Sequence, residues 1–248
     1  MKEKQLNIIL RVKPIVAAVV LLAVSSAWYL TWLSSSVMAS LIPLPFPRLN
    51  LLMVLAFLFL VVVMMVAMML PSALPMILTF NGLAKRQEEG RGTTLVFVSA
   101  YFVIWGIFGA LAFISVGLVS LGWPPAQITV FLAPSLLLLA GVYQFSRSKE
   151  FCLSGCQSPL TFVLKHWKPG VSGGLRMGLR HALYCLGCCW LFMLILFFVG
   201  SMSLLWMGIF SLVIFAEKIG ARGVSFSRLI GGLLVLLGLV LGLRVLLP

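Results

Sequence analysis

Ten residues from His181 to Trp190, HALYCLGCCW, place a histidine and three cysteines in an otherwise apolar run. If the run is helical, His181, Cys185 and Cys188 share an arc of about 60°, and Cys189 lies just beside it. Thiolates and imidazoles are ligands of soft metal ions, and paired thiols also support redox chemistry. The spacing therefore predicts a metal-binding or redox-active face on this helix.

The rise of a helix limits how many of these ligands one ion can share. His181 and Cys188 would lie about 10 Å apart along the axis, so one ion would take a neighbouring pair, such as Cys185 with Cys188 or His181 with Cys185. A second element must supply further ligands. The two other cysteines, Cys152 and Cys156, are four residues apart, which suits two thiolates on one helical turn. We predict that these two complete the site.

A second group of sulfur atoms lies in VVVMMVAMMLPSALPMILTF, residues 61–80. Its methionines are paired four residues apart, and thioethers prefer Cu(I). Methionine also fills gaps in apolar cores, so packing remains an alternative for the run alone. Met68 and Cys185 would lie at similar depths, about 18 and 16 Å from the inner ends of their helices. We therefore predict Met64 or Met68 as a further ligand or transfer station.

The composition places these residues in a membrane protein. Of the 248 residues, 62% are hydrophobic and 9% are charged, against roughly 25% charged in soluble domains. Several apolar runs exceed the roughly 18 residues that cross a bilayer core. The sequence predicts an all-α, polytopic transmembrane bundle that forms a single domain over 1–248. About seven spans are expected, at 13–33, 50–80, 93–119, 127–145, 174–199, 202–217 and 227–247.

The basic residues predict the orientation of these spans. Counted before, between and after the seven spans, Lys and Arg alternate as 4, 1, 3, 0, 6, 0, 3 and 1. The positive-inside rule then places the N-terminus in the cytoplasm and the C-terminus outside, in a bacterial inner membrane. This pattern accounts for the net charge of +13, so no nucleic-acid partner is expected. Segment 146–173 becomes a cytoplasmic loop that carries Cys152 and Cys156, where structural disulfides are not expected.

Two further features bear on function. Pro71 and Pro75 predict a kink or break in the second span, which would free carbonyl oxygens inside the membrane. Glu217 at the end of the sixth span reads as a solvated cap, with a supporting role at the metal site as the alternative. The chain has no Asp and only five acidic residues, so a Mg²⁺ or Ca²⁺ site is not expected. No catalytic residues are predicted, and the sequence favours a protein that is not an enzyme.

Several segments together resemble the bacterial domain-of-unknown-function family described as predicted metal-binding integral membrane proteins. The resemblance covers roughly residues 50–245 and implies metal binding but no particular reaction. The family pattern often has Gly after the histidine, where this chain has Ala182; this departure changes packing and no ligand. The segments that carry the resemblance are MMVAMMLPSALPMI, FCLSGCQSPLTF, GLRHALYCLGCCWLFM and GSMSLLWM followed by AEK.

The sequence therefore predicts the binding or handling of a soft metal, copper rather than zinc. The expected partners are the lipid bilayer and a membrane metalloenzyme or metal chaperone. One alternative is a thiol–disulfide redox protein that uses Cys185 and Cys188. Another is a metal transporter, although the scarcity of intramembrane carboxylates argues against proton coupling. The predicted metal ligands are Cys152, Cys156, His181, Cys185, Cys188, Cys189, Met64 and Met68.

Overall fold

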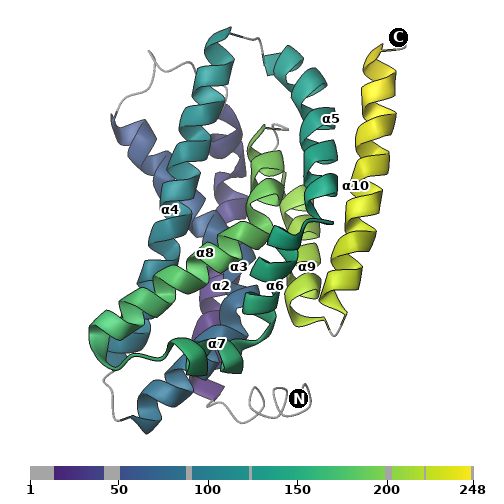
Figure 1. The fold of residues 1–248 in the computed structure, drawn as a ribbon. Helices are drawn as coiled ribbons and strands as arrows, with labels where there is room; N and C mark the ends of the chain where they lie inside the picture. The colour runs from purple at the N-terminus through teal and green to yellow at the C-terminus, as the bar shows by residue number, and fades with distance from the viewer. Residues whose placement is uncertain are drawn as a thin grey trace.

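A computed structural model describes residues 14–41, 51–87, 91–122, 125–198, 203–220 and 222–246. All regular structure in these ranges is α-helical, which confirms the predicted all-α class (Figure 1). In chain order the helices are α2 (Pro14–Leu41), α3 (Leu51–Arg86), α4 (Arg91–Gly122), α5 (Pro125–Tyr143), α6 (Arg147–Gln157), α7 (Pro159–His166), α8 (Gly170–Phe198), α9 (Leu204–Ile219) and α10 (Gly223–Leu246).

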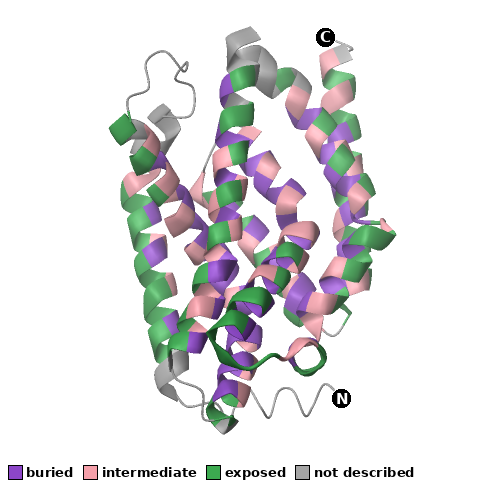
Figure 2. Ribbon diagram, turned by 60° about the vertical axis from the view of Figure 1, so that its left-hand side comes forward, coloured by how far each residue is buried: buried purple, intermediate pink, exposed green. Residues whose placement is uncertain are grey.

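The long helices form a bundle in which α8 runs obliquely past its neighbours (Figure 1). Helix α8 contacts α4, α5, α6 and α9, while α3 contacts α2, α4, α7 and α9. Buried residues line the inward faces of the helices and exposed residues cover the outside (Figure 2). The exposed residues of the long helices are mostly apolar, as expected where lipid rather than water is the surrounding solvent.

Five helices of the described chain are long and apolar enough to cross a bilayer. They are α2, α3, α4, α8 and α10. Helix α9 has 16 residues, and the apolar part of α5 within the described residues runs from Leu132 to Tyr143. The structure therefore contains five candidate spans among the described residues. The predicted total of about seven spans would require α5 and α9 to cross the bilayer as well.

Helix α3 runs without interruption through Pro71 and Pro75, so the expected break in this span is absent. Hydroxyl groups near the prolines bond backbone carbonyls of the same helix. The Ser72 hydroxyl donates to the Met69 carbonyl at 2.9 Å, and the Thr79 hydroxyl donates to the Pro75 carbonyl at 2.7 Å. These acceptors differ from the Ala67 and Pro71 carbonyls, which lose their amide donors to the two prolines.

The segment treated as a loop in the sequence analysis contains the short helices α6 and α7. The Ser146 side chain caps α6 by accepting a hydrogen bond from the Lys149 backbone amide at 3.1 Å, a favourable way to start a helix. Pro159 starts α7, where its missing amide proton costs nothing. Because α6 is helical, Lys149, Leu153 and Cys156 share its buried face, and this face packs against α8.

Close contact between α4 and α8 depends on glycine in α8. A Cβ atom at Gly178 would lie 2.3 Å from the Phe97 carbonyl oxygen and 2.9 Å from the Ala100 Cβ of α4. Small residues let transmembrane helices approach in this way. The contact sets Tyr101, one residue beyond Ala100, beside the middle of α8.

We expect Gly178→Ala to lower the free energy of unfolding by about 1–3 kcal/mol, because the added methyl group overpacks the α4–α8 contact. Thermal unfolding in detergent, followed by circular dichroism, measures the change. The matched control is Gly232→Ala in α10, where an added Cβ meets nothing within 4 Å and the helix should keep or slightly gain stability. Equal melting temperatures for both variants would contradict the packing argument.

Candidate metal centre

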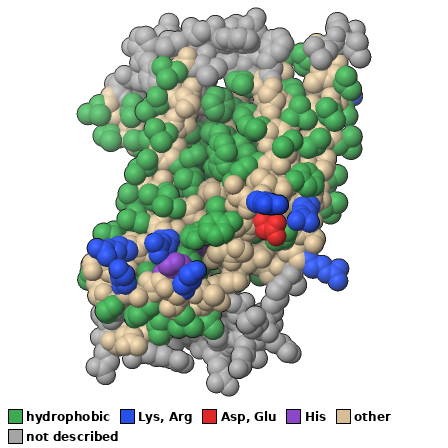
Figure 3. Space-filling model, viewed as in Figure 1, with side chains coloured by type: hydrophobic (Ala, Val, Ile, Leu, Met, Phe, Trp, Pro, Cys, Tyr) green, Lys and Arg blue, Asp and Glu red, His purple; other side chains and the backbone are tan. Residues whose placement is uncertain are grey.

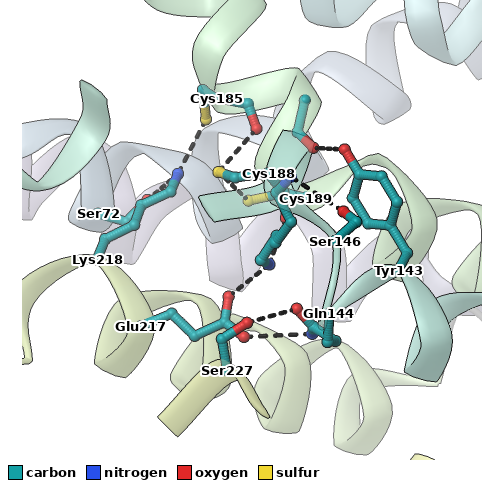
Figure 4. Close-up of polar contacts among 12 residues, drawn as sticks. Ser72, Tyr143, Gln144, Ser146, Cys185, Cys188, Cys189, Glu217, Lys218 and Ser227 are labelled. Carbon is teal, nitrogen blue, oxygen red and sulfur yellow. Dashed lines mark hydrogen bonds and ion pairs between the residues drawn. The ribbon is translucent and has the colours of Figure 1, made fainter. Parts of the chain in front are cut away.

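The sulfur of Cys185 lies at the centre of a buried polar cluster contributed by several helices. The Cys185 side chain is fully buried. The Lys218 ammonium of α9 donates to its Sγ at 2.9 Å (Figure 4). The Tyr101 hydroxyl of α4 lies 3.0 Å from the same atom. A sulfur surrounded by strong donors is an environment that suits a thiolate or a thiolate bound to metal.

Three other thiols surround Cys185. The Cys188 thiol donates to the Cys185 carbonyl at 3.1 Å, and its sulfur lies 3.1 Å from that of Cys189. From α6, the buried Cys156 thiol lies close enough to Cys185 and Cys188 for these side chains to shift its pKa. We call Cys156, Cys185, Cys188 and Cys189 the thiol cluster. All of them are buried and free of disulfides.

The two cysteines of α6 have different environments. Cys156 joins the thiol cluster, and its hydrogen bond with Cys185, together with burial, raises the pKa of the Cys156 thiol above its usual value. Cys152 lies outside the cluster, because its sulfur packs against Gly187, so closely that a Cβ there would lie 2.5 Å away. Burial raises the pKa of Cys152 as well. Both α6 thiols are therefore neutral near pH 7 without metal.

His181 lies one turn before Cys185 and is 98% buried, with 2% of its surface exposed. Its ring stacks on Tyr101 and Phe97, with centroid distances of 5.3 and 6.0 Å. Neither ring nitrogen has a hydrogen-bond partner among the described residues. A buried imidazole without a partner is costly, and such groups are rare in folded proteins.

A single lysine connects the thiol cluster with α3, the helix that carries the predicted methionine ligands. Met64 and Met68 are fully buried in α3. The Lys218 ammonium also donates to the Ser72 hydroxyl of α3 at 3.2 Å, and Ser72 lies one helical turn from Met68. One lysine thus connects the cysteine face of α8 with the methionine face of α3, and Met64 lies a further turn along.

A buried ion pair supports the cluster from the side of α6. The Lys149 ammonium lies 2.8 Å from a Glu217 carboxylate oxygen and also donates to the Cys188 carbonyl. Gln144 donates to the other Glu217 oxygen at 3.2 Å and accepts from Ser227 at 2.7 Å (Figure 4). Burial lowers the pKa of Lys149, but the Glu217 charge, its hydrogen bond and the neighbouring Cys188 and Cys189 side chains together outweigh burial and leave the pKa raised. Glu217 is 1% exposed, so its interpretation as a solvated cap is wrong.

Three residues of the site, Lys149, Lys218 and Tyr101, were not predicted from the sequence. The two lysines entered only the count of basic residues that predicts orientation, and the tyrosine had no predicted role. One signal was available, because Lys149, Leu153 and Cys156 follow the spacing of a single helical face. The burial of Lys218 had no comparable signal, since it depends on how α9 meets α3 and α8.

The thiol cluster does not have a metal-binding geometry in this structure. The described residues contain no group of three or more His, Cys, Asp or Glu side chains placed to hold a metal ion. Two sulfurs bound tetrahedrally to one ion at about 2.3 Å would lie about 3.8 Å apart. The Cys188 and Cys189 sulfurs are 3.1 Å apart, because these thiols contact each other directly. An ion requires these side chains to separate.

We expect Glu217→Gln to destabilise the protein by about 3–5 kcal/mol, because it leaves the Lys149 charge buried without its partner. The matched control is Glu150→Gln, which removes an ion pair with Arg228 whose side chains are 51% and 56% exposed; that change should cost less than about 1 kcal/mol. Thermal unfolding of both variants in detergent measures the difference. A stable Glu217→Gln protein would show that the pair does not hold α6 in place.

Comparison with known proteins identifies the family. No curated protein and no solved structure matches the chain. Residues 58–241 match the family described as "PpoB2: Copper chaperone", a range that includes α4 to α9, most of α3 and α10, and every residue of the site described above. The match covers well over half of the chain, and the protein therefore belongs to this copper chaperone family.

Proposed function

We propose that this protein carries Cu(I) as cargo in the thiol cluster and delivers it to a partner metalloprotein. The observation that carries the proposal is the convergence of thiols from α6 and α8 around Cys185 in a member of a copper chaperone family. Thiolates favour Cu(I) among the common cellular metals. Buried thiols with neighbouring thiols also allow an ion to move by exchange of one ligand at a time.

Cys185 is the central ligand in this proposal, and Cys156 or Cys188 is the second. Where Cys156 is the second ligand, His181 provides a third ligand position, because its unpartnered ring lies one turn from Cys185. Since the Cys156 thiol is protonated without metal, loading releases protons and becomes tighter as the pH rises.

We assign the remaining predicted ligands to the transfer of the ion rather than to its main binding site. Met64 and Met68 are stations along α3, reached past Ser72 and Lys218. Cys189 is an additional ligand that can replace another thiol of the cluster during exchange. Cys152 lies at the edge of the thiol cluster, against Gly187. In this proposal it exchanges the ion with a partner protein that binds beside α6.

We propose a seven-span arrangement in a bacterial inner membrane, in which α5 and α9 cross together with the five candidate spans. Helix α2 begins and α10 ends at opposite ends of the bundle (Figure 1), as an odd number of crossings requires. Basic side chains gather at the lower end of the face in Figure 3. The positive-inside rule then assigns that end to the cytoplasm. The N-terminal basic residues used for the orientation lie outside the described residues.

Cys185→Ser tests the proposed site directly. We expect anaerobically purified wild-type protein to bind Cu(I) in competition with a Cu(I)-specific chelator, and the variant to bind about a hundredfold more weakly, because a hydroxyl is a poor ligand for a soft ion. Cys152→Ser is the matched control and should retain nearly full affinity in solution. Wild-type protein that binds no stoichiometric Cu(I) would overturn the proposed function.

His181→Phe separates a structural role from a ligand role. Without metal, we expect the variant to be more stable by about 1–3 kcal/mol, because it removes an unsatisfied buried polar group. Its Cu(I) affinity should fall by about tenfold, because a ligand is lost. The second histidine supplies the control: His166 bonds the Phe162 carbonyl in α7, and His166→Phe should leave the affinity unchanged. Unchanged affinity in the His181 variant would exclude this residue as a ligand.

A further inference from the structure

The buried charges around the thiol cluster do not cancel. Among the described residues, the buried charged side chains are Lys149, Glu217 and Lys218. Lys149 and Glu217 form a neutral pair. The hydrogen bonds of Lys218 go to the Ser72 hydroxyl and the Cys185 sulfur, and neither acceptor is a carboxylate. One positive charge therefore remains at the site.

An ammonium in an apolar bundle is expensive unless an anion lies beside it. The acceptor that can supply this anion is the Cys185 sulfur, 2.9 Å away, which becomes a thiolate when it binds metal. The total charge of a loaded site then depends on the metal. For any given set of thiolates, a Cu(I) complex carries one more negative charge than the corresponding Zn(II) complex.

We propose that Lys218 is a specificity-determining residue that favours monovalent Cu(I) over divalent Zn(II). This inference rests on the proposed function and extends it to the choice of metal. Two thiolates with Cu(I) have a net charge of −1, which the Lys218 ammonium neutralises. The same two thiolates with Zn(II) are neutral, so the ammonium stays buried without a counter-charge and repels the more highly charged ion more strongly.

The size of the effect follows from Coulomb's law. An ion bound to Cys185 would lie about 5 Å from the Lys218 nitrogen, where one unit of charge at an effective dielectric constant near 20 changes affinity by roughly two hundredfold. The site is buried, so salt screens this interaction only weakly. The thiolates alone would still bind either metal, and the lysine changes their relative affinity.

Lys218→Met removes the charge and keeps an unbranched side chain of similar length. Chelator competition, carried out separately with Cu(I) and Zn(II), gives the ratio of the two affinities. We expect the Cu(I)/Zn(II) ratio to fall by about two hundredfold relative to wild type. Lys218→Arg keeps the charge and should hold the ratio within about threefold. Lys165→Met removes an exposed lysine of α7 and should leave the ratio unchanged.

The possible outcomes are distinct. If wild-type protein binds Cu(I) and the ratio is unchanged in Lys218→Met, this inference is overturned and the proposed function stands. If wild-type protein binds no Cu(I), both fail together. Thermal unfolding checks that each variant is folded. Should Lys218→Met not fold, Lys218→Gln provides the same test, because it removes the charge but keeps a hydrogen-bond donor for Ser72 and Cys185.

Discussion

The contact between the Lys218 ammonium and the Cys185 sulfur is the interaction on which the rest of the site depends. A charge inside an apolar bundle must meet an opposite charge or a strong acceptor, because no water is available to solvate it. Here the acceptor is a sulfur in the middle of α8, and Ser72 of α3 provides the second bond. The consecutive helices α8 and α9 are thereby connected to the distant helix α3 at the point where the thiols converge.

The ion pair of Lys149 with Glu217 plays a complementary part. It joins α6 to α9, and the Lys149 bond to the Cys188 carbonyl joins α6 to α8. Buried ion pairs contribute little net stability compared with apolar packing, but breaking one is costly. The effect of the Lys149–Glu217 pair is to hold α6 in position. A helix of 11 residues has little apolar surface to hold it, and the pair fixes the face that carries Cys156 against the cysteines of α8.

The proposed carrier function requires that the ion be held and also released. In this proposal the thiol cluster would meet both needs, because it offers more sulfurs than Cu(I) requires and the thiols interact with one another. Tyr101 and Lys218 provide hydrogen-bond partners for the Cys185 sulfur. The ring nitrogens of His181 and the indole nitrogen of Trp105 have no such partner among the described residues.

The sequence by itself determined the all-α class, the positions of the long apolar helices and the shared face of the α8 cysteines, because helical periodicity and apolar length are local properties. It also predicted that thiols from two segments would converge. Only the tertiary structure decided that Cys156 joins the cluster while Cys152, one turn away, packs on Gly187, and that Lys218 and Glu217 are buried rather than solvated. These outcomes depend on the register and crossing of α4, α6, α8 and α9, which are set by contacts such as Gly178 against Phe97 between residues far apart in the chain.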